Sequence, residues 1–210
     1  LFVEPYSESK VIWRGEMIGS KEAAEISGAT NVMYSDSFEG VLQDIALSCE
    51  TIYLNTFEYP RYECKVKTIQ QRFIEEIKAK FPLHKFERTA PILNKQRMIK
   101  SQEEIEVTKQ ACDITAEAFR RCLKTVRPDV YEYQIQAEIE YIFKYNGANG
   151  HAYYPIVAAG KNACCLHYSA NNKILKDGDL ILFDIGCEYK NYSSDLSRTI
   201  PINGKFTQRQ

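Results

Sequence analysis

The spacing of apolar residues along the first part of the chain alternates between the period of a helix and that of a strand. In stretches such as FEGVLQDIALS, apolar side chains recur every three or four residues, as on one face of a helix. Short runs such as TIYLN are typical of strands. The pattern predicts strands over residues 10–15 and 51–55 and helices over 20–29, 38–48 and 64–81. We expect an α/β domain over residues 1–90, with the polar segment 84–94 as the linker that follows it.

Two longer amphipathic helices are predicted next. Ser101 and Glu104 have the spacing of a capping box, in which each side chain bonds the backbone N–H of the other residue. The helix that follows is expected to run to about Val126. A second pair with the same spacing, Asp129 and Glu132, predicts the start of the next helix. The sequence Asn-Gly at 146–147 is expected to end it.

Short β-favouring runs replace the helical pattern after these helices. They are separated by Asn, Asp and Gly, and they lie at 154–160, 164–169, 180–186 and 192–202. Helices followed by strands favour an α+β domain over alternating parallel units. We therefore predict an α+β domain over residues 91–210.

Composition and charge exclude two kinds of partner. The 27 Lys and Arg residues are balanced by 28 Asp and Glu residues, so no basic excess points to nucleic acid. The longest apolar runs are far shorter than the roughly 20 residues that a membrane helix needs. The seven cysteines are odd in number and lack CxxC spacing, which favours reduced thiols and a cytoplasmic protein. The chain begins LFVEPYS, without Met or a signal segment, and we expect both ends to be cut from a longer polypeptide.

Two aspartates in the last strands are the strongest chemical signal. If the polar stretch at 188–191 forms a hairpin loop, Asp184 faces Asp195 directly across the two strands. Opposed side chains on one face of a sheet lie about 4.5–5.5 Å apart at Cβ, and like charges at that distance repel each other. A pair of divalent cations would resolve the conflict. The alternative is that both residues cap strand ends, and a register shift of one residue would put them on opposite faces.

The sequence around these aspartates resembles the sequences of a known family. The phrases NACCLHYSANN and DGDLILFDIGCEYKNYSSDLSRTIPINGKFT are similar to those of the Xaa-Pro aminopeptidases (aminopeptidase P) of the pita-bread metallopeptidase family. A weaker similarity extends back through MIKSQEEIEV. The resemblance implies that residues 91–210 are the first half of the catalytic domain and that residues 1–90 are part of the N-terminal domain.

The resemblance also implies the chemistry. Members of this family remove an N-terminal residue that precedes proline, by means of a hydroxide that bridges two metal ions, usually manganese. Asp184 matches the carboxylate that chelates one metal, and Asp195 matches the one that bridges both. His167 matches a histidine that steadies the reacting centre or shuttles a proton, and Tyr153 matches a tyrosine beside the metal ligands. The other three ligands, a histidine and two glutamates, are expected in the second half of the domain.

Alternatives to this interpretation remain at the level of sequence. A prolidase, which cleaves Xaa-Pro dipeptides, has the same fold and metals as the Xaa-Pro aminopeptidases and most of the same sequence segments. A pita-bread relative without metal could serve as a binding module, although both Asp184 and Asp195 are present. His167 could be a strand histidine that hydrogen bonds satisfy. The resemblance further allows a homo-oligomer.

Overall fold

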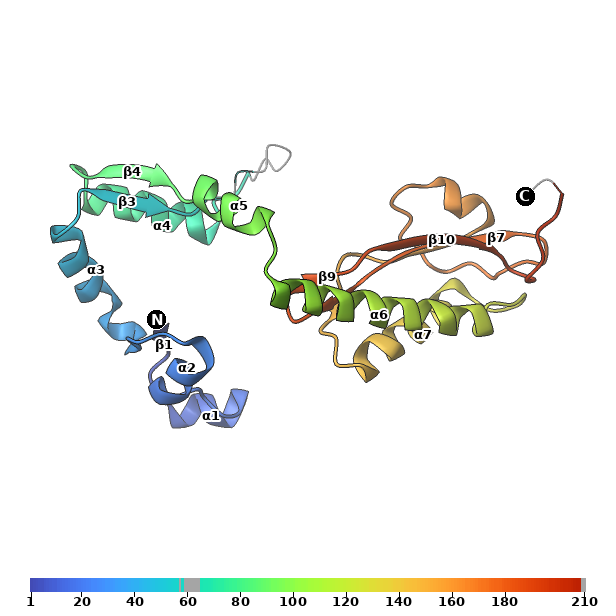
Figure 1. Ribbon diagram of the computed structural model, residues 1–210, viewed down its shortest axis with the longest axis horizontal. Coiled ribbons are helices and arrows are strands. Elements are labelled where there is room, and N and C mark those ends of the chain that lie inside the picture. Colours follow the sequence, from blue (N-terminus) through green and yellow to red (C-terminus); the bar gives the residue numbers. More distant parts are fainter. Residues whose placement is uncertain (57, 59–64, 209–210) are drawn as a thin grey trace. The chain divides into compact units, whose positions relative to one another are not determined.

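The computed structural model describes residues 1–56, 58 and 65–208 and divides the chain into two compact units (Figure 1). They comprise Leu1–Met98 and Ile99–Gln210, and each is described by itself. The assignment of the two family domains to residues 1–90 and 91–210 stays a prediction.

The first unit contains short helices and two small parallel strand pairs. In chain order its elements are β1 (Phe2–Val3), α1 (Glu8–Arg14), α2 (Ser20–Ser27), β2 (Met33–Tyr34), the 3-10 helix η1 (Ser35–Ser37), α3 (Phe38–Leu47), β3 (Thr51–Leu54), α4 (Ile69–Lys80), β4 (Lys85–Arg88) and α5 (Ala90–Met98). Strand β1 pairs with β2 and strand β3 pairs with β4, both in parallel. The predicted helices over 20–29 and 38–48 and the predicted strand over 51–55 are confirmed.

Local capping explains where the helices of the first unit begin and end. Gly28 ends α2 in the left-handed conformation, with φ 69°, as predicted. Helix α4 begins at Ile69, after Thr68, because Thr68 and Gln71 form a capping box. The helix predicted over 64–81 is therefore confirmed from Ile69 onward, and residue 64 lies outside the described residues.

Two predictions for the first unit are wrong. Residues 10–15 were predicted as a strand, but residues 10–14 belong to helix α1 and Gly15 follows its end; the Ser7 hydroxyl accepts a bond from the Lys10 N–H and starts the helix. The apolar residues behind the strand prediction do not face a core, since Ile12 is 81% and Trp13 is 85% exposed. The predicted linker 84–94 instead forms β4, which pairs with β3, and the beginning of α5.

The second unit packs two helices against antiparallel strands. Its elements are α6 (Gln102–Thr125), α7 (Glu132–Tyr145), β5 (Gly150–His151), β6 (Ile156–Ala159), the 3-10 helix η2 (Gly160–Cys164), β7 (Leu180–Ile185), β8 (Cys187–Tyr189), β9 (Tyr192–Ser193) and β10 (Leu196–Pro201). The strands form two antiparallel sheets, in the orders β10-β7-β6 and β5-β8-β9. The predicted succession of helices and then strands is confirmed.

The capping box predicted at the start of α6 is confirmed. The Ser101 N–H donates to the Glu104 carboxylate at 2.6 Å, and the Glu104 N–H donates to the Ser101 hydroxyl at 3.3 Å. The second predicted box is wrong. Helix α7 begins after Tyr131, whose N–H donates to the Gln134 side chain, and Asp129 lies two residues earlier with φ 66°. The Glu132 side chain therefore takes no part in capping the helix and points into the protein interior.

The end of α7 agrees with the sequence. Asn146 is the residue that ends the helix, and Gly147 follows with φ 77°, a left-handed conformation that glycine adopts without steric cost. In contrast, the strand predicted over 164–169 is wrong. Those residues complete η2 and form a turn, in which the Cys165 N–H donates to Asn162 and the Tyr168 N–H donates to Cys165.

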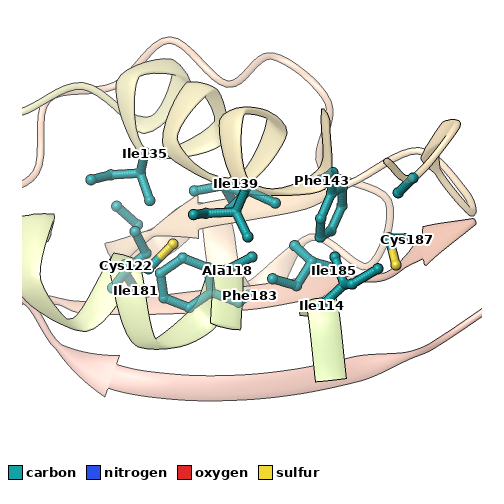
Figure 2. Packing of buried hydrophobic residues seen from close by; sticks show 14 of the residues in the cluster. Ile114, Ala118, Cys122, Ile135, Ile139, Phe143, Ile181, Phe183, Ile185 and Cys187 are labelled. Carbon is teal, nitrogen blue, oxygen red and sulfur yellow. The ribbon is translucent and has the colours of Figure 1, made fainter. Parts of the chain in front are cut away.

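The core of the second unit lies between the helices and one face of β7 (Figure 2). Ile135, Ile139 and Phe143 extend from α7 toward the sheet, and each is at most 1% exposed. Phe119 of α6 meets Phe183 edge to face at 5.6 Å between ring centroids. Full burial of one such side chain stabilises the fold by about 1.5–3 kcal/mol.

Strand β7 alternates between the core and the opposite face. Ile181, Phe183 and Ile185 are fully buried, while Leu182 and Asp184 retain solvent exposure. Successive side chains of a strand point to opposite faces, so Asp184 lies on the face that the core does not cover. No helix in the described part of the chain combines the length and the apolar character that crossing a membrane requires.

Candidate metal centre

The hairpin that carries the two aspartates turns at Lys190 and Asn191. Both residues have positive φ, 48° and 68°, and Tyr189 pairs with Tyr192 on either side of them. Positive φ at both central residues is the geometry of a two-residue hairpin loop of type I′, whose twist matches that of the strands. The turn is therefore centred one position later than the sequence analysis placed it.

This turn changes the partner of Asp184. In the ladder between β7 and β10, Asp184 pairs with Ser197, so the predicted direct pairing with Asp195 is wrong. The displacement is two residues along one strand, and side chains alternate with a period of two. Asp195 consequently stays on the same face as Asp184, as its diagonal neighbour.

A close crossing of the backbone lies between the two aspartates. A Cβ atom on Gly186 would lie 1.9 Å from the carbonyl oxygen of Ser194 and 3.0 Å from the Tyr153 ring. Real side-chain carbons do not approach a backbone oxygen so closely, so only glycine allows the strands to meet here. The crossing holds the segment before Asp195 against the segment after Asp184.

A buried polar cluster secures the same crossing. The hydroxyls of Thr115 and Ser194 lie 2.7 Å apart, and the backbone N–H of Cys187 donates to both, at 3.1 and 3.0 Å. Thr115 belongs to α6, so this cluster ties the helix to the residue that immediately precedes Asp195. Buried hydroxyls without partners are costly, and here each one has a partner.

Tyr153 joins the two aspartates. Its hydroxyl donates to Oδ1 of Asp184 at 2.8 Å and lies 3.0 Å from Oδ1 of Asp195. A phenol carries one proton, so it can satisfy only one of the two carboxylates at a time. The remaining negative charge at this point has no counter-ion among the three side chains.

Burial and the two carboxylates act together on Tyr153. Desolvation is the largest cause, followed by the hydrogen bonds to Asp184 and Asp195, and all of these raise the pKa of the phenol far above its ordinary value. The hydroxyl therefore stays protonated and acts as a donor. Its oxygen lies within hydrogen-bond distance of both carboxylates, so its single proton is available to either one.

The donor set fits a hard divalent cation. Carboxylate oxygens are the ligands that magnesium and manganese prefer in proteins, and a cation beside Asp184 and Asp195 would remove the repulsion between them. Asp195 is exposed and Asp184 is half-buried, so both can be reached from solvent. Among residues 1–56, 58 and 65–208, no third histidine, cysteine, aspartate or glutamate completes a cluster able to hold a metal ion. The described residues thus offer two carboxylates to such a cation.

His167 lies in the turn that follows η2 and is exposed. Its imidazole makes no hydrogen bond within the described residues. The residues that follow it are anchored: the Tyr168 hydroxyl donates to Glu132 at 2.7 Å, and the Tyr154 hydroxyl donates to the Ser169 carbonyl at 3.1 Å. Because Tyr154 adjoins Tyr153, the histidine turn and the aspartate pair are attached to neighbouring residues.

Sequence reasoning missed Glu132, which it assigned to a helix cap. The structure buries this side chain completely and surrounds it with hydrogen-bond donors. A signal was present, since Glu132 lies three and seven residues before Ile135 and Ile139, on the apolar stripe of α7. A charged residue on such a stripe indicates a buried polar network.

Comparison with known proteins defines the class. Residues 106–210 match the model of "Metallopeptidase family M24", and residues 1–53 match that of "Aminopeptidase P, N-terminal domain". The chain therefore belongs to metallopeptidase family M24, and the predicted pita-bread fold with a preceding α/β domain is confirmed.

Among curated proteins, the chain is similar to the Xaa-Pro aminopeptidase of Escherichia coli. The two are 34% identical over 95% of this chain and 45% of that protein. Human Xaa-Pro aminopeptidase 3 is 31% identical over 100% of this chain and 41% of its own length. The Xaa-Pro dipeptidase of Pyrococcus horikoshii is 34% identical over 62% of this chain and 37% of its own length. The chain spans less than half the length of these relatives.

Solved structures agree with this assignment. A Bacillus anthracis protein assigned as an aminopeptidase P superposes with a TM-score of 0.92 at 32% identity, covering 100% of this chain and 50% of that one. The low-pH form of E. coli aminopeptidase P gives a TM-score of 0.85 at 32% identity, covering 99% of this chain and 47% of that one.

Proposed function

We propose that the protein is a metal-dependent Xaa-Pro aminopeptidase, which releases the N-terminal residue from peptides with proline at the second position. The observation that carries the proposal is the aspartate pair, in which one tyrosine hydroxyl serves both Asp184 and Asp195. Membership of family M24 and relatives named Xaa-Pro aminopeptidase support it.

The cofactor would be two divalent metal ions, and the family resemblance points to Mn²⁺. When bound, the ions would polarise the scissile carbonyl and lower the pKa of water. One solved relative is described as a zinc-substituted E. coli aminopeptidase P in complex with product, which supports a metal site in this family. Because the chain spans less than half of its curated relatives, we propose that the remaining ligands come from sequence outside these 210 residues.

The four candidate site residues of this chain would have different roles. Asp184 and Asp195 would hold the cations through carboxylate oxygens. The Tyr153 hydroxyl, which lies within hydrogen-bond distance of both, would help to orient them. His167 would sit beside the substrate, where a neutral imidazole can accept or return a proton at the atoms that react. Tyr153 itself would remain protonated, because its pKa is raised by burial and by both carboxylates.

A dipeptidase is the second candidate. The relative named Xaa-Pro dipeptidase is as identical, at 34%, as the E. coli aminopeptidase, but over 62% rather than 95% of this chain. The greater coverage favours the aminopeptidase. A non-catalytic binding module is the remaining alternative, and the retained aspartate pair argues against it.

The test is hydrolysis by the protein expressed from its full reading frame. A Xaa-Pro-Xaa tripeptide and a Xaa-Pro dipeptide are each incubated with added Mn²⁺ and, separately, with EDTA. Cleavage of the tripeptide that EDTA abolishes is the expected result. Cleavage of the dipeptide alone would replace the aminopeptidase with a prolidase, and cleavage of neither would favour the binding module.

Location and assembly belong to the same proposal. The described residues contain six free cysteines, which supports a reducing compartment, and we propose the cytoplasm. A homo-oligomer is proposed from family resemblance alone. Cell fractionation tests the location, and light scattering on the purified protein tests the assembly.

A further inference from the structure

The carboxylate of Glu132, at the start of α7, is completely buried and collects four hydrogen bonds. Oε1 accepts from the Ala159 N–H at 2.8 Å and from the Asn162 amide at 3.0 Å. Oε2 accepts from the Tyr168 hydroxyl at 2.7 Å and from the Lys173 N–H at 3.0 Å. The side chain is 0% exposed.

Only a carboxylate can receive this set of donors. An ionised carboxylate offers about four lone-pair sites and no proton, and here each oxygen receives two bonds. A glutamine in the same place would direct its NH₂ group at two of the donors. The tyrosine hydroxyl could rotate and accept, but a backbone N–H could not, and a buried donor without a partner is unfavourable.

The four donors belong to one segment of the chain. Ala159 ends β6, Asn162 lies in η2, Tyr168 follows the turn, and Lys173 closes the segment. The Glu132 N–H donates in turn to the Lys173 carbonyl at 2.9 Å, so the segment is fastened at its end by two bonds to one residue. Glu132 therefore gathers a loop of residues 159–173 around a single carboxylate.

His167 lies inside this loop, immediately before the anchored Tyr168. The loop has its own tie to the aspartate pair, since Tyr154 holds the Ser169 carbonyl while the adjacent Tyr153 contacts Asp184 and Asp195. In Figure 1, the orange segment that follows β6 lies on the opposite side of β7 and β10 from α6. Asp184 alternates along β7 with the core residues Phe183 and Ile185, so its side chain points away from the core that α6 and α7 cover.

We propose that Glu132 is a positioning residue that acts through His167, by holding the 159–173 loop in the form that presents the imidazole to the aspartate pair. The inference deepens the proposed function and rests on it, because it assigns His167 a part in the reaction. Glu132 itself contacts neither substrate nor metal. Its effect on turnover must therefore disappear when the imidazole is absent.

A double-mutant cycle tests this dependence on the protein from the full reading frame. Glu132→Gln should lower kcat for the Xaa-Pro-Xaa tripeptide by about 10- to 100-fold, with metal content and KM near those of the wild type. His167→Ala should lower kcat by a comparable factor. In the His167→Ala background, Glu132→Gln should then change kcat by no more than about twofold, because coupled residues are not additive.

Two further variants keep the cycle interpretable. Glu138→Gln changes the same residue type on the same helix, at a half-buried ion pair with Arg121, and should leave kcat within about twofold of the wild type. Tyr168→Phe removes one of the four donors and leaves the packing intact, so it replaces Glu132→Gln if that variant does not fold. It should cost about three- to tenfold in kcat and follow the same non-additivity.

The outcomes separate the two hypotheses. If wild-type protein cleaves the tripeptide but His167→Ala is equally active, the proposed role of His167 fails and the positioning role fails with it. If His167→Ala is impaired and Glu132→Gln lowers kcat by the same factor in both backgrounds, only the positioning role of Glu132 is overturned. Loss of metal from Glu132→Gln would also overturn it, since the carboxylate would then act on the metal centre.

Discussion

The hydroxyl of Tyr153 lies 2.8 Å from Oδ1 of Asp184, a residue 31 positions further along the chain. The same oxygen is 3.0 Å from Asp195. One hydroxyl, with a single proton to donate, thus lies between two carboxylates on the face of the sheet that the core does not cover.

Replacing Tyr153 by phenylalanine should weaken metal binding or turnover by about 10- to 100-fold, because partners that orient metal ligands typically contribute that much. The fold should be retained, since the ring remains. Titration with Mn²⁺ and steady-state kinetics measure the effect. Tyr145→Phe, at a tyrosine that is 73% exposed, is the control and should change neither quantity. Unaltered metal affinity and turnover in Tyr153→Phe would remove the tyrosine from the site.

Replacing Asp195 by asparagine should abolish the stabilisation that metal gives. A ligand present at 100 times its Kd stabilises a protein by about 2.7 kcal/mol, and this gain should vanish in the variant. Without metal, the variant should be as stable as the wild type or slightly more stable, because the repulsion with Asp184 is relieved. Thermal unfolding with and without Mn²⁺ measures both effects. Asp113→Asn, at an exposed position on α6, should keep the metal response.

Replacing Gly186 by alanine should destabilise the second unit by about 1–3 kcal/mol or more, because the new methyl group would lie 1.9 Å from the Ser194 carbonyl oxygen. Denaturant unfolding measures the loss. Gly40→Ala is the matched control, since nothing lies within 4 Å of its Cβ and its place in α3 favours alanine by about 0.5–1 kcal/mol. The two substitutions should therefore have opposite signs. A neutral Gly186→Ala would mean that the strands can separate at the crossing.

The buried thiol of Cys122 should make stability depend on alkaline pH. Burial, with a further contribution from the charge of Glu138, raises the pKa of Cys122 to about 12. An unfolded cysteine has a pKa of about 8.5. The stabilisation is complete below the unfolded pKa and is lost as pH rises toward the folded one, at about 1.4 kcal/mol per pH unit.

Urea unfolding at pH 7 and pH 10 checks this prediction. The wild type should lose roughly 2 kcal/mol more between the two pH values than Cys122→Ala does. Cys112→Ala, which removes an exposed thiol from the same helix, should leave the pH dependence of the wild type unchanged. Equal pH dependence in all three proteins would show that Cys122 ionises in the folded state.

The features that the sequence predicted correctly depend on neighbours within about four residues. Ser101 and Glu104 form the expected box because both partners lie in one turn. Gly28 and Gly147 end helices because the conformation is a property of glycine itself. The shared face of Asp184 and Asp195 was also predicted, but it holds in a different register: the actual pairing differs from the predicted one by two residues, and a difference of one would have put them on opposite faces.

The features that escaped prediction depend on partners far along the chain. Residues 85–88 form a strand because residues 51–54 pair with them. The polar residues in β4 give no local pattern that would indicate a strand. The loop position at Lys190 and Asn191 depends on left-handed conformations that non-glycine residues adopt only where the surrounding strands favour them. The predicted strand over 164–169 is a turn for the same reason, because a strand needs a partner and none of the described strands pairs with these residues.

The sequence by itself determined the succession of helices and strands in the second unit and, through the segments around its two aspartates, the family. Tertiary structure alone decided that Tyr153 would meet both carboxylates and that Glu132 would gather residues 159 to 173. The physical reason is the range of the interactions. Local patterns encode bonds within a few residues, whereas these contacts join positions 27 to 42 apart, which only the packed core brings together.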